Sequence, residues 1–182
     1  MEEESLERIR DYLSLIGITG LIIILDQVTK WWVRQSLAIG EAWSPFEWLM
    51  PYARILHTNN TGAAFGLFPA GSTLFAVVAV LVTAAILYYY PKVPRNQWLL
   101  RLALGLQLAG ALGNLIDRIN HGTVTDFISV GTFPVFNVAD SSISVGTALL
   151  IVATWIEERR LAKRKQEQQE GLLQEPSPHE AE

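Results

Sequence analysis

The chain alternates between long apolar segments and shorter polar connections, and four of the apolar segments reach the length of a membrane span. A bilayer core needs roughly 20 residues of helix to cross it. The four segments are residues 12–32, 71–90, 98–116 and 140–156. Segment 71–90 contains no charged residue and closes on three tyrosines, which suit the headgroup layer. The pattern therefore predicts an all-α membrane protein, a four-transmembrane-helix bundle.

Two longer connections, residues 33–70 and 117–139, separate these segments. The first contains "YARILHTNNTG", whose start alternates in the manner of a strand before an Asn-Thr-Gly turn. We interpret it as a small β element at the membrane surface. A plain hairpin loop with Gly62 at a positive φ would explain the same residues.

Composition agrees with a membrane protein, because half of the residues are hydrophobic and only 18% are charged. The absence of cysteine excludes disulfides and thiolate zinc sites. The histidines, at positions 57, 121 and 179, lack the spacing of metal ligands, so we expect neither a metal nor another cofactor. No basic segment interleaved with aromatic residues suggests a nucleic-acid partner.

The distribution of Lys and Arg predicts the orientation. With four spans, both termini lie on one side of the membrane, and ten of the 14 basic residues fall on that side. The other side has Lys30, Arg34, Arg54 and Arg118. By the positive-inside rule, the termini are cytoplasmic and both longer connections face outward. We expect residues 1–166 to form one domain, and residues 167–182 to be a disordered cytoplasmic tail because they offer little apolar surface.

The first span carries an acid and a base near its outer end. Asp26 and Lys30 stand four residues apart, so they share one helix face. Charged residues inside a span are costly and need a partner or a function. A local ion pair would account for these two without any chemistry, and the residues alone leave both interpretations open.

The outer ends of the last two spans carry further polar residues. The stretch "AGALGNLIDR" includes Asn114, Asp117 and Arg118, which interhelical hydrogen bonding and a helix-end Asp-Arg ion pair would explain. In "FNVADSSI", Asn137 or Asp140 would cap the first turn of the next helix. Each feature thus has a purely structural interpretation.

Capping and pairing do not account for the way these residues converge on the outer face. The set is Asp26, Asn60, Asn114, Asp117, Arg118, Asp126, Asn137 and Asp140. Two carboxylates at a partly dry site can share one proton and activate water for attack on an amide. The sequence therefore permits an aspartic-protease mechanism. A serine nucleophile among residues 141, 142 and 144 is less favoured, because only Lys30 is placed to act as its base.

Five ordered blocks, "DQVTK", "NNTGAAFG", "GALGNLIDR", "VTDFI" and "FNVADSSI", resemble the lipoprotein signal peptidase (signal peptidase II) family of bacterial membrane aspartyl peptidases. The match covers roughly residues 12–158. Two departures are visible: Ala109 precedes Gly110 where the family often has a glycine pair, and Thr125 stands where it often has valine. Both change side-chain volume only slightly, so they affect fine packing more than activity.

The resemblance implies a catalytic pair, Asp126 and Asp140, in the last two blocks. It also implies supporting or substrate-binding residues: Asp26, Lys30, Asn60, Gly62, Gly110, Asn114, Arg118, Asn137 and Ala139. The family's architecture adds an extracytoplasmic β cradle and a short amphipathic segment over the site. As a hypothesis, Asp140 at the start of its helix is held anionic and acts as base, while Asp126 carries the shared proton.

The implied reaction is hydrolysis of the peptide bond before a diacylglyceryl-modified cysteine, which releases the signal peptide. We therefore expect a multi-pass enzyme of the bacterial cytoplasmic (inner) membrane, with its site near the outer leaflet. The expected partners are modified prolipoproteins and membrane lipids, and we expect a monomer.

Two other classes remain open on the residues alone. A small transporter would also collect Asp, Asn and Arg inside spans, although the chain shows no internal repeat. A non-catalytic assembly factor would keep the fold without needing both acids. Selective cleavage of a lipid-modified precursor distinguishes the peptidase from both.

Overall fold

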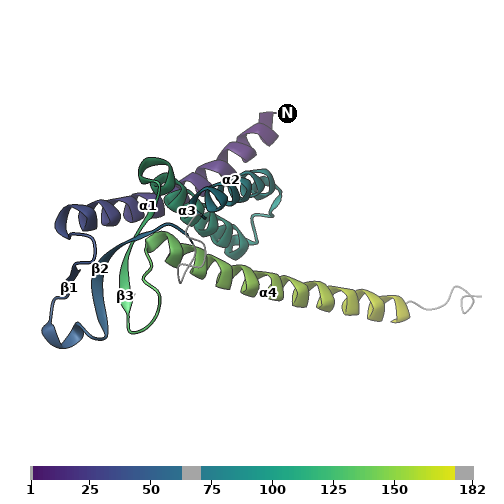
Figure 1. Ribbon diagram of the computed structural model, residues 1–182. Helices are drawn as coiled ribbons and strands as arrows, with labels where there is room; N and C mark the ends of the chain where they lie inside the picture. The colour runs from purple at the N-terminus through teal and green to yellow at the C-terminus, as the bar shows by residue number, and fades with distance from the viewer. Residues whose placement is uncertain (1, 63–70, 175–182) are drawn as a thin grey trace, which may run out of the picture.

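The computed structural model describes residues 2–62 and 71–174. Its helices α1 (Glu2–Ser36), α2 (Ser72–Tyr89), α3 (Trp98–His121) and α4 (Val138–Gln174) form a bundle (Figure 1). Each contains a segment that is long and apolar enough to cross a membrane. The predicted four-helix membrane architecture is confirmed.

A small antiparallel sheet lies at one end of the bundle, with strand order β1-β2-β3. Its strands are β1 (Ala42–Trp43), β2 (Ala53–Asn60) and β3 (Val124–Val130). Two short 3-10 helices, η1 (Glu47–Leu49) and η3 (Tyr90–Lys92), complete the described elements. Strand β2 confirms the predicted β element and excludes the plain-loop alternative for these residues. Residues 63–66 of the block "NNTGAAFG" lie outside the described part, and the amphipathic segment stays a prediction.

Helix α3 is the centre of the bundle. In its most apolar stretch of 18 residues, 56% are buried, against 17%, 11% and 17% in the corresponding stretches of α1, α2 and α4. Apolar side chains on the outer helices, such as Leu21, Val80 and Ile151, are exposed, as expected for surfaces that face lipid. Small residues allow the helices to approach closely. A Cβ on Gly105 would lie 3.0 Å from the Ile18 side chain of α1.

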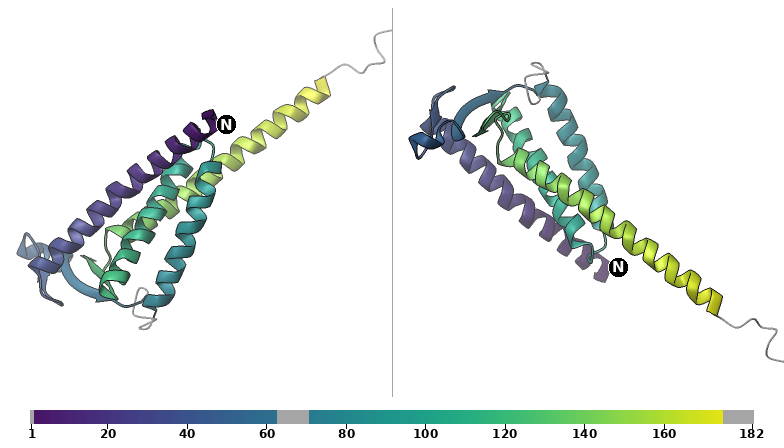
Figure 2. Two further views of the ribbon diagram at one scale, coloured as in Figure 1. Left: turned by 90° about the horizontal axis from the view of Figure 1, so that it is seen from above. Right: turned by 90° about the horizontal axis from the view of Figure 1, so that it is seen from below.

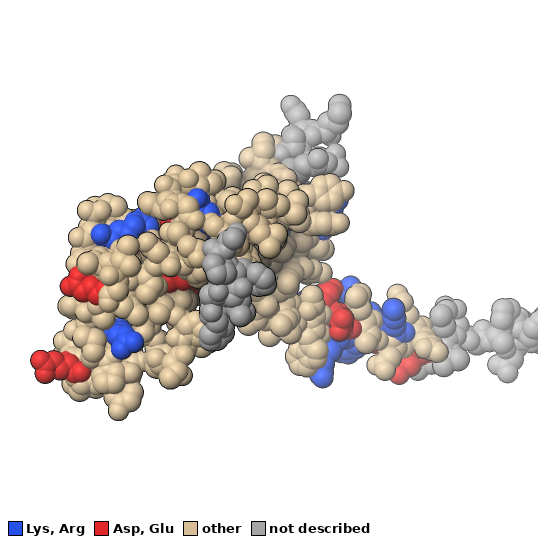
Figure 3. All heavy atoms as spheres, viewed as in Figure 1, with Lys and Arg blue, Asp and Glu red and all other residues tan. Residues whose placement is uncertain are grey.

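The two ends of the bundle differ. Figure 2 shows the sheet at one end, and at the other the start of α1 and the part of α4 that extends beyond the bundle. On the face drawn in Figure 3, charged side chains gather near the sheet and along this α4 extension. Both ends of the described chain therefore lie on the side away from the sheet, as four spans require.

Helix boundaries depart from the predicted spans where polar residues continue a helix. Helix α3 runs past residue 116 to His121, and Gly122, with φ of 75°, ends it by donating its N–H to the Arg118 carbonyl at 3.0 Å. Helix α4 continues to Gln174, so residues 167–174 are helical where a disordered tail was predicted, and residues 175–182 lie outside the described part. Strong helix formers and spaced pairs such as Lys163 with Glu167, at 3.6 Å, explain this continuation.

Strand β3 lies inside the segment predicted as a loop, residues 117–139. Its first four residues are all buried, so the strand lacks the alternation of polar and apolar positions that indicates a half-buried strand. It pairs with β2, and the register places Thr58 opposite Asp126 and Asn60 opposite Val124. The β element therefore extends into the second outer connection.

A cluster of charge ties α1 to α3 at the end away from the sheet. Asp11 of α1 accepts hydrogen bonds from Arg101 Nη2 at 2.8 Å and from Arg95 Nε at 3.0 Å. Arg101 also donates to the Val93 carbonyl at 3.0 Å and lies 4.3 Å from the centre of the Tyr90 ring. We refer to Asp11, Arg95 and Arg101 as the far-end cluster.

Candidate active site

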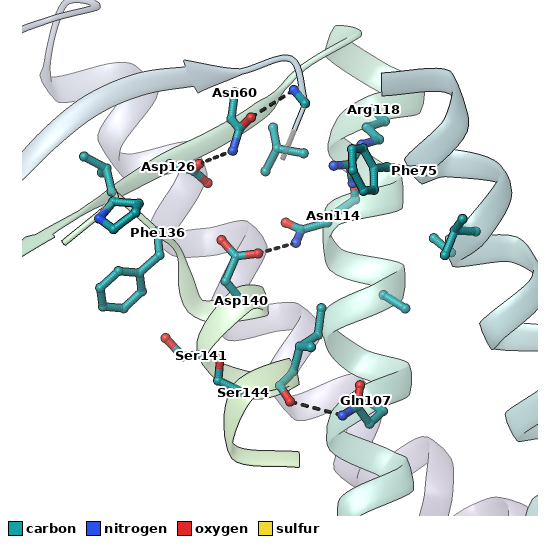
Figure 4. Close-up of a pocket in the computed structure, with 18 of the residues that line it drawn as sticks. Asn60, Phe75, Gln107, Asn114, Arg118, Asp126, Phe136, Asp140, Ser141 and Ser144 are labelled. Atoms are coloured by element: carbon teal, nitrogen blue, oxygen red, sulfur yellow. Dashed lines mark hydrogen bonds between the residues drawn. The ribbon is translucent and has the colours of Figure 1, made fainter. Parts of the chain in front are cut away.

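The two acids singled out in the sequence line one cavity of about 790 Å³ between α2, α3, α4 and the sheet. Asp126 comes from the middle of β3 and is 2% exposed, while Asp140 comes from the first turn of α4 and is partly buried. Figure 4 shows their carboxylates on the same side of the cavity, with Asn114 of α3 beside them. The structure therefore brings together the residues that the two sequence blocks carry.

Local sequence fixes the position of Asp140. Asn137 Oδ1 accepts the main-chain N–H of Asp140 at 2.9 Å, and Asp140 Oδ2 accepts the main-chain N–H of Asn137 at 3.2 Å. This reciprocal pair is a capping box that starts α4. The capping interpretation is thus confirmed, but it does not exclude chemistry, because Asp140 Oδ1 remains directed at Asn114, whose Nδ2 donates to it at 2.8 Å.

Two asparagines hold Asp126. Asn60 Nδ2 of β2 donates to Oδ2 at 2.9 Å, and Asn137 Nδ2 donates to Oδ1 at 2.7 Å. Burial is the main cause that raises the pKa of Asp126, to about 6, and the charge of Asp140 raises it further. Hydrogen bonds from the two asparagines and the charge of Lys30 act in the opposite direction. Asp126 therefore titrates near neutral pH.

Asn114 links the acids to the charges beneath them. Its Oδ1 accepts hydrogen bonds from Lys30 Nζ at 3.0 Å and from Asn137 Nδ2 at 3.2 Å. Because its Nδ2 donates to Asp140, both polar atoms of the Asn114 side chain have hydrogen-bond partners. The interhelical hydrogen bonding expected for this residue is confirmed, and it lies within the site.

The Asp26–Lys30 ion pair is also confirmed, at 2.9 Å with both side chains fully buried. It is not merely local, because Asp26 Oδ1 accepts the main-chain N–H of Ala139 at 2.9 Å. Lys30 contacts Asp26, Asn114 and Asp117, so its three protons have partners and it is not placed as the base of a serine nucleophile. Ser141 and Ser142 donate to main-chain carbonyls.

Close packing at α3 depends on two glycines. A Cβ on Gly110 would lie 2.5 Å from the Ala139 carbonyl oxygen, and one on Gly113 would lie 2.8 Å from Asp26 Oδ2. Ala139 itself is fully buried. Larger residues at these positions would push α3 away from α1 and from the first turn of α4.

Arg118 faces the cavity instead of pairing with its neighbour in sequence. Its Nη1 donates to the Asn114 carbonyl at 3.3 Å and its guanidinium lies 5.5 Å from the Phe75 ring centre. Its Nε has no hydrogen-bond partner among the described residues. Gly62, which lines the same cavity, donates its N–H to Asn60 Oδ1 at 2.9 Å.

Sequence reasoning assigned Asp117 the wrong partner. The helix-end pair with Arg118 does not form; Asp117 Oδ2 lies 3.3 Å from Lys30 Nζ and Oδ1 lies 3.6 Å from Arg34 Nη1. Asp117 Oδ2 also accepts the main-chain N–H of Thr125 at 3.0 Å. The signal available in the sequence was its place in the set of polar residues that converge on the outer face, together with Asp26 and Lys30. Within the described ranges, no group of three His, Asp or Glu side chains is placed to hold a metal ion.

Comparisons with known proteins agree on one family. The model of family A8 peptidases, described as signal peptidase (SPase) II, matches residues 18–156. The lipoprotein signal peptidase of Desulfitobacterium hafniense (strain DSM 10664 / DCB-2) is 40% identical over 151 residues, which cover 82% of this chain and 98% of that one. The lipoprotein signal peptidase of Staphylococcus carnosus (strain TM300) is 37% identical over 147 residues, 79% of this chain and 91% of that one.

A solved structure described as a bacterial membrane enzyme has the same fold. It superposes with a TM-score of 0.73 at 33% identity and covers 80% of this chain and 89% of its own. A second structure with the same description gives 0.69 at 34% identity, with 78% and 92% covered. Fold, family model and relatives thus agree over the described bundle and sheet.

Proposed function

The chain belongs to the signal peptidase II family of aspartic peptidases and removes signal peptides from prolipoproteins, and we propose that Asp126 and Asp140 are its catalytic pair. The observation that carries the proposal is that both carboxylates line one cavity, where the pKa of Asp126 is raised to about 6. Membership of this family decides against the transporter and the assembly-factor alternatives.

The two aspartates have different roles in the proposed mechanism. Asp140 lies in the first turn of α4, where the helix dipole stabilises an anion, and it accepts the proton of the attacking water. Asp126, whose pKa is raised to about 6, holds the shared proton when it is protonated and donates it toward the scissile carbonyl as the tetrahedral intermediate forms. Collapse of the intermediate breaks the C–N bond: Asp140 gives its proton to the leaving amine, and a hydroxyl of the intermediate returns a proton to Asp126.

The cavity suits a substrate that carries lipid. Apolar side chains of α2 line one wall, among them Phe75, Val78 and Val82, and Ile143 of α4 lies opposite. We propose that the scissile bond lies before a diacylglyceryl-modified cysteine, whose acyl chains stay in the leaflet while the amide enters the polar part of the cavity. Membrane lipids then contact the same outer surfaces as the substrate.

The remaining polar residues support this pair. We propose that Arg118 binds a substrate carbonyl, since its guanidinium faces the cavity without a carboxylate partner among the described residues. The other supporting residues position the aspartates or the chain around them: Asp26, Lys30, Asn60, Gly62, Gly110, Asn114, Asn137 and Ala139. One chain brings both aspartates and their supporting residues to a single cavity, so we propose that the monomer is active.

The proposed location is the bacterial cytoplasmic (inner) membrane, with both termini cytoplasmic and the site near the outer leaflet. Because the chain has no cysteine, single substitutions can report the sidedness. An impermeant thiol reagent applied to intact cells should label Thr58→Cys and His121→Cys but not Glu3→Cys or Asn96→Cys. Labelling at position 96 with the membrane sealed would reverse the orientation.

The catalytic assignment is tested with purified protein and a precursor peptide made with and without the diacylglyceryl group. Wild type should cleave only the modified peptide. Asp126→Asn and Asp140→Asn should each abolish cleavage while still binding the modified peptide, because Asn preserves size but cannot accept or share the proton. Turnover above about a tenth of wild type in either variant would leave less than roughly 1.4 kcal/mol attributable to that carboxylate and would contradict the proposed pair.

A further inference from the structure

Two buried carboxylates outside the proposed catalytic pair hold the main chain beside it. Asp26 Oδ1 accepts the N–H of Ala139 at 2.9 Å, and Asp117 Oδ2 accepts the N–H of Thr125 at 3.0 Å. Each of these N–H groups belongs to the residue that immediately precedes one of the two proposed catalytic aspartates. The two contacts are therefore equivalent, one on α4 and one on β3.

Both N–H groups lie where regular secondary structure leaves a donor without a partner. Ala139 is in the first turn of α4, whose N–H groups have no acceptor within the helix. Thr125 is on β3, an edge strand of the sheet. Because both residues are buried, an unpaired N–H at either would be costly. The two carboxylates satisfy these donors and thereby fix the backbone.

Lys30 joins the two carboxylates. Its Nζ lies 2.9 Å from Asp26 Oδ2 and 3.3 Å from Asp117 Oδ2, and all three side chains are 0% exposed. The remaining proton of Lys30 goes to Asn114 Oδ1, at 3.0 Å. We refer to Asp26, Lys30 and Asp117 as the ion triad.

We propose that the ion triad is a positioning unit, in which Lys30 fixes the two catalytic aspartates relative to one another through the main chain, and that Asp117 is a further positioning residue of the enzyme. This inference rests on the proposed catalytic pair. A dyad needs its two carboxylates at one separation to share a water and a proton, and small displacements of reacting groups reduce rates steeply. Two carboxylates bound to one cation give such a fixed separation.

Stability alone does not explain the ion triad. Buried ions are expensive to desolvate, and well-packed apolar residues of similar volume often hold helices together equally well. Apolar side chains, however, cannot accept the N–H groups of Ala139 and Thr125. The ion triad thus provides hydrogen-bond acceptors at two defined points, which a purely structural contact between α1 and α3 would not require.

The primary test compares substitutions at Asp117 with matched ones at Asp11, a carboxylate that also joins α1 to α3 but belongs to the far-end cluster. Asp117→Ala should lower kcat by about 100-fold with KM within a few-fold, because the reacting groups are displaced while the cavity is retained. Asp117→Asn keeps an oxygen for the Thr125 N–H and should recover about tenfold of that loss. Asp11→Ala and Asp11→Asn should leave kcat unchanged.

Equal kcat for the Asp117 and Asp11 variants in folded, inserted protein would overturn the proposal, as would a rise in KM at constant kcat. If Asp117→Ala does not fold, Asp117→Asn still decides, since it should have a lower kcat than Asp11→Asn at equal yield.

The linking role of Lys30 has its own readout, hydrogen exchange at the main-chain amides of residues 124–126 and 138–140. Lys30→Met should accelerate exchange in both segments, and Asp11→Asn in neither. Acceleration in only one segment would show that Lys30 does not link the two aspartates. Failure of the underlying assignment looks different, because then Asp126→Asn and Asp140→Asn would themselves retain turnover.

Discussion

The ion triad and the far-end cluster both join α1 to α3 through buried charge, but they differ in the groups that their side chains contact beyond the two helices. In the far-end cluster, Arg101 contacts Asp11, the Ser14 hydroxyl, a carbonyl oxygen and an aromatic ring, all of them away from the cavity. In the ion triad, each carboxylate continues to an N–H beside the cavity. Buried charge therefore holds helices together in the far-end cluster, whereas in the ion triad, by our proposal, it fixes the geometry of the reacting groups.

Arg101→Leu gives the largest expected effect on stability. It leaves Asp11 buried with only Arg95, which is partly exposed, so we expect a loss of about 3 kcal/mol in the free energy of unfolding. Cleavage by the protein that remains folded should proceed at the wild-type kcat. Thermal unfolding in detergent and kcat measured on the same preparation separate the two quantities.

The matched double variant sharpens this result. Asp11→Leu with Arg101→Leu should regain much of the lost stability at full activity, because the uncompensated charge is gone. Apolar replacement of all three residues of the ion triad should instead abolish turnover in the protein that folds, because the N–H groups of Ala139 and Thr125 lose their acceptors. Full activity in that triple variant would remove the difference between the two clusters.

Gly110→Ala should lower kcat by about 100-fold, a barrier increase of roughly 2.7 kcal/mol. The added Cβ would lie 2.5 Å from the Ala139 carbonyl oxygen, so the first turn of α4, which carries Asp140, must shift. Gly105→Ala is the control, since its Cβ meets only the Ile18 side chain at 3.0 Å. A comparable loss of kcat in both variants would mean that bundle packing in general, rather than the position of Asp140, limits turnover.

Asp126→Asn should make the protein more stable near pH 7 even though it is inactive. Burial and the charge of Asp140 raise the pKa of Asp126 from 3.8 to about 6, so the folded protein retains a proton that the unfolded chain releases. The stability associated with this proton is present below about pH 4 and is lost as pH rises through about 6. The gain at pH 7 is at most about 3 kcal/mol, and less because Asn places an NH₂ group against Asn60 or Asn137.

The measurement is the thermal midpoint of wild type and Asp126→Asn at pH 7 and near pH 4. The advantage of the variant should shrink at the lower pH. Asp11→Asn offers the opposite comparison, because it removes a paired carboxylate and should be less stable than wild type at pH 7. A constant difference between Asp126→Asn and wild type over this range would contradict the raised pKa.

Truncation after Gln166 should have the smallest effect. The removed part of α4 is mostly polar and lies beyond the bundle, at the end away from the sheet (Figure 2). We expect kcat and thermal midpoint close to those of the full chain. A loss of kcat by orders of magnitude in correctly inserted protein would mean that the α4 extension contributes to the site.

Features that depend on short spacing were predictable from the sequence. The four spans follow from segment length and hydrophobicity, the Asp26–Lys30 pair from its four-residue spacing, and the cap of α4 from Asn137 and Asp140. In the ion pair and in the cap, the two partners lie within about one helical turn, so the helix geometry alone brings them together. The five ordered blocks then indicated which polar residues belong to one site.

Features that depend on contacts between distant segments were not predictable. The first four residues of strand β3 are all buried, so only its pairing with β2 shows that it is a strand. Asp117 was assigned to its sequence neighbour Arg118, whereas its partners come from α1 and β3. Propensity and spacing report on one element at a time, and which acid reaches which base across the bundle is decided by how α1 and α3 pack.

The pairing of β2 with β3 has a consequence for the order of folding. The Asn60–Asp126 hydrogen bond joins residues 66 apart in the chain, and both α2 and α3 lie between them. Closing so long a loop is slow compared with forming a helix or its cap. The Ala139–Asp26 hydrogen bond beside Asp140 joins residues still farther apart in the chain, so the contacts that hold both aspartates form after the helices themselves. A chain whose last helix is still entering the membrane therefore lacks the contacts that would bring the two proposed catalytic aspartates together, so by our proposal cleavage begins only when assembly is complete.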